Sequence, residues 1–171
     1  MDDISIKPTG LKYGLYYGAA AILYTLFTFV SNLVTNPLVS ILAYILIIAA
    51  IVFGIKEYKK LNEGFISLKQ GISLGVIISL IGTVLSGIFS IIYMTLINTD
   101  AKSQILEGLE EQLSAMPPES LDMMMGLYET MFEPIPMFFM GVVMALIGGV
   151  FWGLVIGAIM KNDRPPMSDD Y

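Results

Sequence analysis

The sequence contains no cysteine and no histidine among its 171 residues. Without cysteine there can be no disulfide, iron–sulfur cluster, zinc finger or thiol nucleophile. Without histidine there can be no Ser-His-Asp triad, no HExxH zinc site and no axial haem histidine. We therefore expect a non-enzymatic protein with no catalytic residue, no cofactor and no metal site.

Charged residues are also scarce, because they make up 14% of the chain while hydrophobic residues make up 56%. A soluble domain is typically about one quarter charged and less than half apolar. Four nearly uncharged runs are long enough to cross a bilayer. The sequence predicts an all-α, polytopic membrane protein, a four-helix bundle forming one domain over residues 1–171. The predicted spans cover about residues 13–34, 38–55, 71–97 and 135–160.

Local signals mark the turns between these spans. Asn36-Pro37 is a break between the first two spans. Gly64 can adopt a left-handed conformation where the second helix stops, and Ser67 with Gln70 has the spacing of a capping box. The polar tail, residues 161–171, is expected to be disordered.

Residues 98–134 form the only sizeable polar segment. Apolar residues recur in it at helical spacing, before and after the helix-breaking pair Pro117-Pro118. They are Ile105, Leu109, Leu113 and Met116, then Leu121, Met124, Met125, Tyr128, Met131 and Phe132. We expect a loop of two amphipathic helices between spans three and four.

Basic residues are unevenly distributed between the two sides of the predicted bundle. Eight belong to the termini and to the loop between spans two and three: Lys7, Lys12, Lys56, Lys59, Lys60, Lys69, Lys161 and Arg164. The 98–134 loop has only Lys102. Because inside-facing loops are rich in Lys and Arg, we expect both termini inside the cell and the acidic 98–134 loop outside. The expected partners are the bilayer and other membrane proteins or a second copy, and not nucleic acid.

The middle of the chain carries a resemblance to a known family. The run IKEYKKLNEGFISLKQGISLG, preceded by a span beginning NPLVSILAYILIIAAIVFGI, resembles an uncharacterised bacterial family, domain of unknown function 4199. The opening KYGLYYGAAAILYTLF is also similar to it, and the resemblance covers essentially the whole chain. It implies a four-span protein of the bacterial inner membrane. It implies no activity, so it transfers no catalytic residue.

Small residues recur at every fourth position in three spans, a pattern that lets helix backbones approach closely in lipid. The predicted packing residues are Gly14, Gly18, Gly75, Ser79, Thr83, Gly87, Gly141, Ala145, Gly149, Gly153 and Gly157. Between Gly141 and Gly157 a straight helix turns by about 160° beyond whole turns. We therefore expect two different neighbours to share this row. The alternative role of such a row is contact with a second copy.

Hydroxyl groups lie on one narrow face of the third span, at Ser79, Thr83, Ser86, Ser90 and Tyr93. They could hydrogen-bond to neighbouring helices or to carbonyls of their own helix, or they could line a polar pathway. The predicted spans lack Asp, Glu, Lys and Arg, which disfavours proton-coupled transport.

Two ion-binding alternatives concern the 98–134 loop. Thioethers of Met123, Met124 and Met125 could capture Cu(I), and Glu107, Glu110 and Glu111 could bind Ca²⁺. Packing of an amphipathic helix and a solvated acidic face explain both sets more simply.

We favour a membrane scaffold or accessory module that acts by helix association. The alternative is a channel or transporter subunit for a small uncharged or lipid-like solute.

Overall fold

A computed structural model describes residues 4–164, and over this range the chain forms six α-helices. They are α1 (Lys7–Val30), α2 (Pro37–Leu61), α3 (Leu68–Ile92), α4 (Ala101–Leu113), α5 (Pro118–Met131) and α6 (Pro134–Met160). A π-helical segment, Tyr93–Ile97, continues α3. The all-α prediction is confirmed.

Four of these helices, α1, α2, α3 with its extension, and α6, are long and apolar enough to cross a membrane. Large apolar side chains on them face outward, such as Leu38 and Ile159, which are 78% and 79% exposed. Apolar surface of this extent is stable in lipid rather than in water. The chain is therefore a membrane protein with four transmembrane helices, as predicted.

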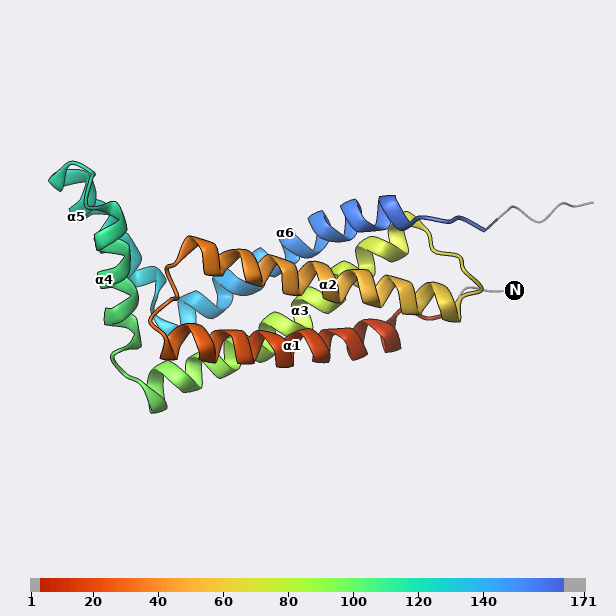
Figure 1. Ribbon diagram of the computed structural model, residues 1–171, viewed down its shortest axis with the longest axis horizontal. Coiled ribbons are helices and arrows are strands. Elements are labelled where there is room, and N and C mark those ends of the chain that lie inside the picture. Colours follow the sequence, from red (N-terminus) through yellow and green to blue (C-terminus); the bar gives the residue numbers. More distant parts are fainter. Residues whose placement is uncertain (1–3, 165–171) are drawn as a thin grey trace, which may run out of the picture.

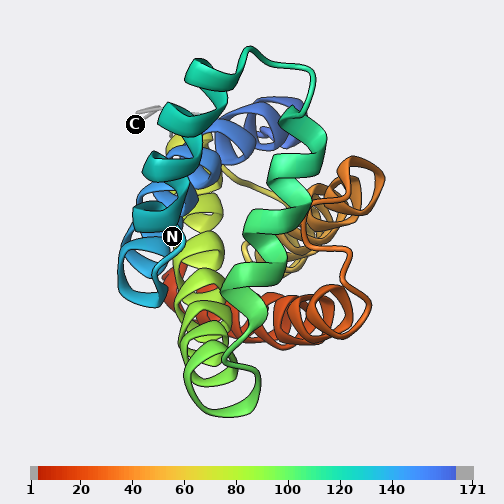
Figure 2. The ribbon, with the colours of Figure 1, turned by 90° about the vertical axis from the view of Figure 1, so that its left-hand side faces the viewer.

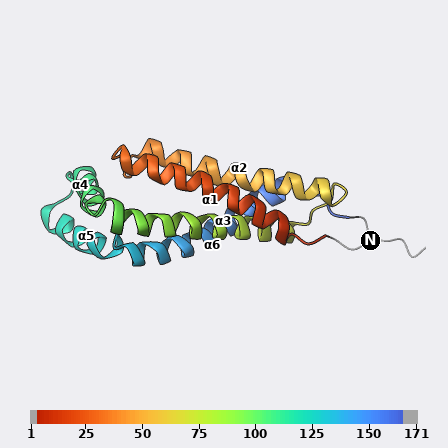
Figure 3. The same cartoon turned by 90° about the horizontal axis from the view of Figure 1, so that it is seen from below.

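The four long helices form two layers, with α1 and α2 packed over α3 and α6 (Figure 3). Helix α3 is central, since its most extensive contacts are with α6 and α1. The start of α1 and the end of α6 lie at the same end of the bundle, which we call the termini end (Figure 1). Helix α4 crosses the opposite end, which we call the α4 end (Figure 2).

Helix boundaries follow the predicted capping signals closely. The Asn36 side chain accepts hydrogen bonds from the backbone N–H of Leu38 and Val39, and Ser67 forms the predicted capping box with Gln70. Helix α1 begins earlier than the predicted span, at Lys7, because proline at the following position fits the first turn of a helix.

The turn after α2 uses two residues with positive φ, Glu63 (55°) and Gly64 (89°). The N–H of Gly64 donates to the carbonyl of Lys59 over 2.6 Å, which closes the end of the helix. The sequence identified Gly64 but not Glu63, because glutamate has no intrinsic preference for this conformation.

The polar tail is ordered at its start. Asn162 pairs with Ile66 through two backbone hydrogen bonds, of 2.9 and 3.0 Å. The prediction of a disordered tail is therefore wrong for residues 161–164, because the turn before α3 offers free backbone groups to pair with. The rest of the predicted tail, residues 165–171, lies outside the described residues.

Candidate functional site

Helices α3 and α6 meet through their glycines. A Cβ atom added to Gly75 would lie 2.5 Å from the carbonyl oxygen of Gly149 and 2.7 Å from the Cα of Gly153. A Cβ on Gly71 would lie 2.8 Å from the Cα of Gly157. The backbones themselves are in contact here, which any larger residue would prevent.

Gly141, at the other end of the row on α6, also faces α3. A Cβ on Gly141 would lie 3.6 Å from Cγ2 of Thr83, and near the same end Gly87 packs against the ring of Phe138. The expectation that two neighbours share the row Gly141 to Gly157 is therefore wrong. That expectation assumed that the neighbouring helix is straight. Helix α3 carries its own small residues at four-residue spacing and stays in contact with the row of α6 from Gly141 to Gly157.

Helix α1 meets α3 in a different way, with glycine on one side and a branched side chain on the other. A Cβ on Gly14 would lie 2.7 Å from Cβ of Ile81, and one on Gly18 would lie 2.6 Å from Cδ1 of Leu85. The ring of Tyr17 fills the space over Gly82 in the same interface. These contacts fix the position of α1 along the axis of α3.

Two serines of the hydroxyl face of α3 form hydrogen bonds within their own helix, and Tyr93 is buried. Ser86 donates to the carbonyl of Thr83 over 3.3 Å, and Ser90 donates to the carbonyl of Ser86 over 3.0 Å. The ring of Tyr93 is buried and stacks on Phe29, with 4.8 Å between ring centroids.

Ser79 differs from Ser86 and Ser90 on this face. Its side chain is fully buried against α6, and within residues 4–164 its Oγ atom has no hydrogen-bond partner. A Cβ on Gly149 would lie 3.0 Å from this oxygen. Ser79 is thus a small residue that permits a close helix contact, and its hydroxyl adds no hydrogen bond there.

A cavity of about 170 Å³ lies between α1, α2 and α3. Ser86 is the residue of the predicted hydroxyl face that lines this cavity. The other lining residues are Tyr17, Ala21, Tyr24, Thr25, Ala43 and Leu46. The Tyr24 hydroxyl donates to the carbonyl of Val39 over 3.3 Å. With apolar walls and a few hydroxyl groups, the cavity suits a small uncharged molecule.

Helix α4 covers the α4 end of the bundle. Its side chains Ala101 and Ile105 are buried in a cluster with Phe29, Tyr93 and Met94. The Gln112 amide donates to the carbonyl of Thr35 over 2.7 Å, and Lys102 forms an ion pair with Glu133.

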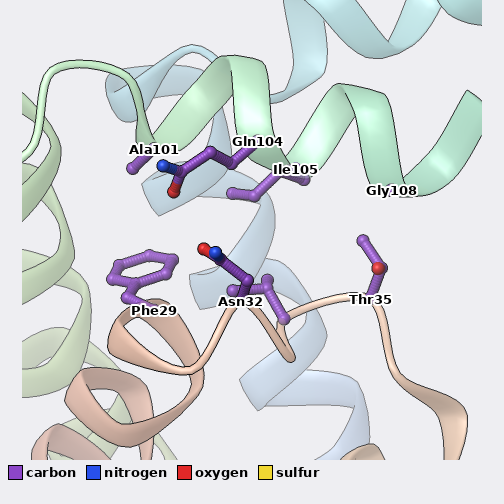
Figure 4. Close-up of a pocket in the computed structure, with 8 residues that line it drawn as sticks. Phe29, Asn32, Thr35, Ala101, Gln104, Ile105 and Gly108 are labelled. Carbon is purple, nitrogen blue, oxygen red and sulfur yellow. The ribbon is translucent and has the colours of Figure 1, made fainter.

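A small pocket of about 40 Å³ remains beneath α4, where Asn32, Thr35 and Gln104 bring polar groups to one space (Figure 4). It is large enough for one or a few water molecules.

The termini end is closed by a hydrogen-bonded network around two buried residues of α2 and its turn. The Tyr58 hydroxyl donates to the carbonyl of Ile4 over 2.9 Å. Asn62 accepts from the N–H of Ile4 over 3.3 Å and donates to the carbonyl of Phe65 over 3.0 Å. The segment before α1 is therefore attached to the turn before α3.

The end of α6 joins the same network. Lys59 donates to the carbonyl of Met160, the last residue of α6, over 2.9 Å. Arg164 forms an ion pair with Glu63 at 3.3 Å and lies over the ring of Phe65. Sequence reasoning did not connect Tyr58, Asn62 and Arg164 in one network, although the first two fall in the run that carries the family resemblance.

Metal-binding side chains do not gather within residues 4–164: no three His, Cys, Asp or Glu residues come close enough together to hold an ion. Glu107, Glu110 and Glu111 accordingly form no such group in α4.

Residues 12–162 match a family model described as "Protein of unknown function (DUF4199)". No curated protein and no solved structure matches the chain. The matched region includes α2, α3 and α6, most of α1, and Tyr58 and Asn62 of the network at the termini end. The chain, which has four membrane-spanning helices, therefore belongs to the DUF4199 family.

Proposed function

We propose that this protein is a non-enzymatic scaffold or accessory module of the bacterial inner membrane that acts by association of its helices. The observation that carries this proposal is the backbone contact between α3 and α6 at Gly75, Gly149 and Gly153. Such a contact makes a rigid pair of helices, around which α1 and α2 present apolar surface to lipid or to another membrane protein.

The state of the hydroxyl groups supports a scaffold over a pore. A polar pathway along α3 would need free hydroxyls, but Ser86 and Ser90 bond to carbonyls of their own helix. Ser79 is buried against α6. At the α4 end, α4 covers the bundle, and at the termini end the network around Asn62 closes it.

Charge distribution supports an orientation with both termini in the cytoplasm. Eight of the nine basic residues belong to segments at the termini end, while Lys102 of α4 is at the other. Membrane proteins retain such residues on the cytoplasmic side.

The native mass of the full chain, extracted gently from its own membrane, tests the scaffold. We expect a discrete assembly containing one or a few unrelated membrane proteins, which are absent from the same preparation of cells lacking this chain. A monomer or homo-oligomer without protein partners would contradict the proposal.

The cavity between α1, α2 and α3 favours a second candidate, a channel or transporter subunit for a small uncharged solute. Swelling of proteoliposomes in glycerol or urea would measure such transport. Ala43→Phe should fill the cavity and abolish the flux, whereas Ala19→Phe, at an exposed position of α1, should not. Absence of flux through the wild-type protein would exclude this candidate for those solutes.

A further inference from the structure

A groove of about 460 Å³ runs between α1 and α2 near the termini end. Its lining combines aromatic, aliphatic and basic side chains: Tyr13, Phe53, Lys56, Glu57, Lys60 and Leu61. Phe53 and Leu61 are 55% and 57% exposed, so the groove opens on the outer surface of the bundle. It lies where the apolar part of α2 gives way to lysines, which is the level of lipid headgroups in a membrane-spanning helix.

The single carboxylate in the groove is neutralised from α1. Glu57 accepts a hydrogen bond from the Lys12 ammonium over 2.7 Å and another from the Tyr13 hydroxyl over 2.8 Å. Lys12 and Glu57 thus form a pair with no net charge. The positive charges of Lys56 and Lys60 remain uncompensated.

These two lysines have no ion-pair partner anywhere in residues 4–164. Lys56 lies over the ring of Phe53, with 5.8 Å from its Nζ atom to the ring centroid, which holds the ammonium at the mouth of the groove. The neighbouring Lys59 is engaged with the end of α6, and Glu63 is paired with Arg164. Glu63, the second acidic residue of this segment, therefore does not offset the positive charge of the groove either.

We propose that the groove binds one anionic phospholipid of the leaflet at the termini end. Lys56 and Lys60 contact the phosphate of its headgroup, and its acyl chains lie along Phe53 and the exposed apolar surface of α2. The charge of the site selects an anionic headgroup, and the apolar wall distinguishes a lipid from free phosphate. This proposal requires only that the chain spans a membrane, so it holds for a scaffold and for a pore alike.

Native mass spectrometry of the full chain can test the proposal with equal amounts of phosphatidylglycerol and phosphatidylethanolamine. We expect the wild-type protein to retain one phosphatidylglycerol preferentially. Lys56→Gln and Lys60→Gln should each weaken this retention about fivefold, the ordinary contribution of one basic residue at an anionic surface, and the double variant about thirtyfold. Retention of phosphatidylethanolamine should not change.

The matched control is the double variant Lys69→Gln, Lys161→Gln, which removes the same charge from exposed positions outside the groove. It should retain phosphatidylglycerol as the wild type does, and Lys56→Arg with Lys60→Arg should restore binding. Equal loss in the groove and control variants, or displacement of the lipid by inorganic phosphate, would overturn the assignment of a lipid site. So would equal retention of both lipids by the wild type.

Discussion

Gly75 of α3 and Gly153 of α6 meet backbone to backbone, since a Cβ atom on the first would lie 2.7 Å from the Cα atom of the second. Lipid tails are as apolar as leucine side chains, so burial of apolar surface does not drive helices together within a bilayer. Close approach, with its many dispersion contacts, is what stabilises this pair. The glycines are therefore the residues on which the stability of the bundle depends most.

Two adjacent glycines of α6 provide a direct test of this contact. A Cβ on Gly149 would lie 2.9 Å from the Cα of Val76, while one on Gly148 would meet nothing within 4 Å. Gly149→Ala should lower the free energy of unfolding by about 1–3 kcal/mol, the usual cost of overpacking. Gly148→Ala should be neutral or stabilising by about 0.5–1 kcal/mol, since alanine favours helix. Thermal unfolding in detergent measures both; equal effects would contradict the contact.

Removing the hydroxyl of Ser79 should stabilise the protein. Its Oγ atom is buried and lacks a hydrogen-bond partner within residues 4–164, which is a cost that alanine does not have. We expect Ser79→Ala to raise the unfolding free energy by up to about 1 kcal/mol. Ser79→Val should lower it, because the added methyl groups would press on Gly149. A marked loss of stability in the alanine variant would point to a hydrogen bond that Ser79 makes.

The Tyr58 hydroxyl should hold the segment that precedes α1. Tyr58→Phe removes its hydrogen bond to the carbonyl of Ile4, at a cost of about 1 kcal/mol. Hydrogen exchange of the amides around Ile4 should become faster, while exchange in the middle of α3 stays unchanged. Tyr44→Phe is the control, because Tyr44 is 59% exposed on the same helix. Equal exchange in both variants would contradict the role of Tyr58.

Docking of α4 across the bundle depends on the absence of a side chain at Gly108. A Cβ there would lie 2.7 Å from Oγ1 of Thr35. Gly108→Leu should displace this part of α4 and accelerate its amide exchange by about 5- to 150-fold, the factor that corresponds to an overpacking cost of about 1–3 kcal/mol. Gly126→Leu, on α5, meets nothing within 4 Å and should leave α4 protected. If exchange in α4 were already fast in the wild type, α4 would not be docked.

The proposed orientation can be tested through the absence of cysteine in the native sequence. Single cysteines at Lys69 and Glu119 occupy exposed positions at opposite ends of the bundle. An impermeant maleimide added to intact cells should label Glu119→Cys but not Lys69→Cys, and both after lysis. Labelling of Lys69→Cys alone in intact cells would show that the orientation is the opposite of the proposed one.

Much of this fold could be predicted from the chain because its signals are local. The length of an apolar run determines whether a helix crosses a bilayer, and capping residues such as Asn36 and Ser67 determine where a helix begins. The approximate positions of the four long helices, the division of the 98–134 segment into α4 and α5, and the capping box depend mainly on neighbours along the chain. For the same reason Glu63, whose positive φ comes from the geometry of the turn, was missed.

Only the tertiary structure decided which residues meet, because hydrophobicity is the same on every face of a lipid-exposed helix and selects no neighbour. The row from Gly141 to Gly157 fits α3 because the two surfaces match in shape, and no periodicity in α6 alone contains that match. The neutralisation of Glu57 by Lys12 likewise joins residues 45 positions apart. Sequence alone determined that this is a four-helix membrane protein; the packing of distant side chains decided where its backbones touch and where its positive charge is left uncompensated.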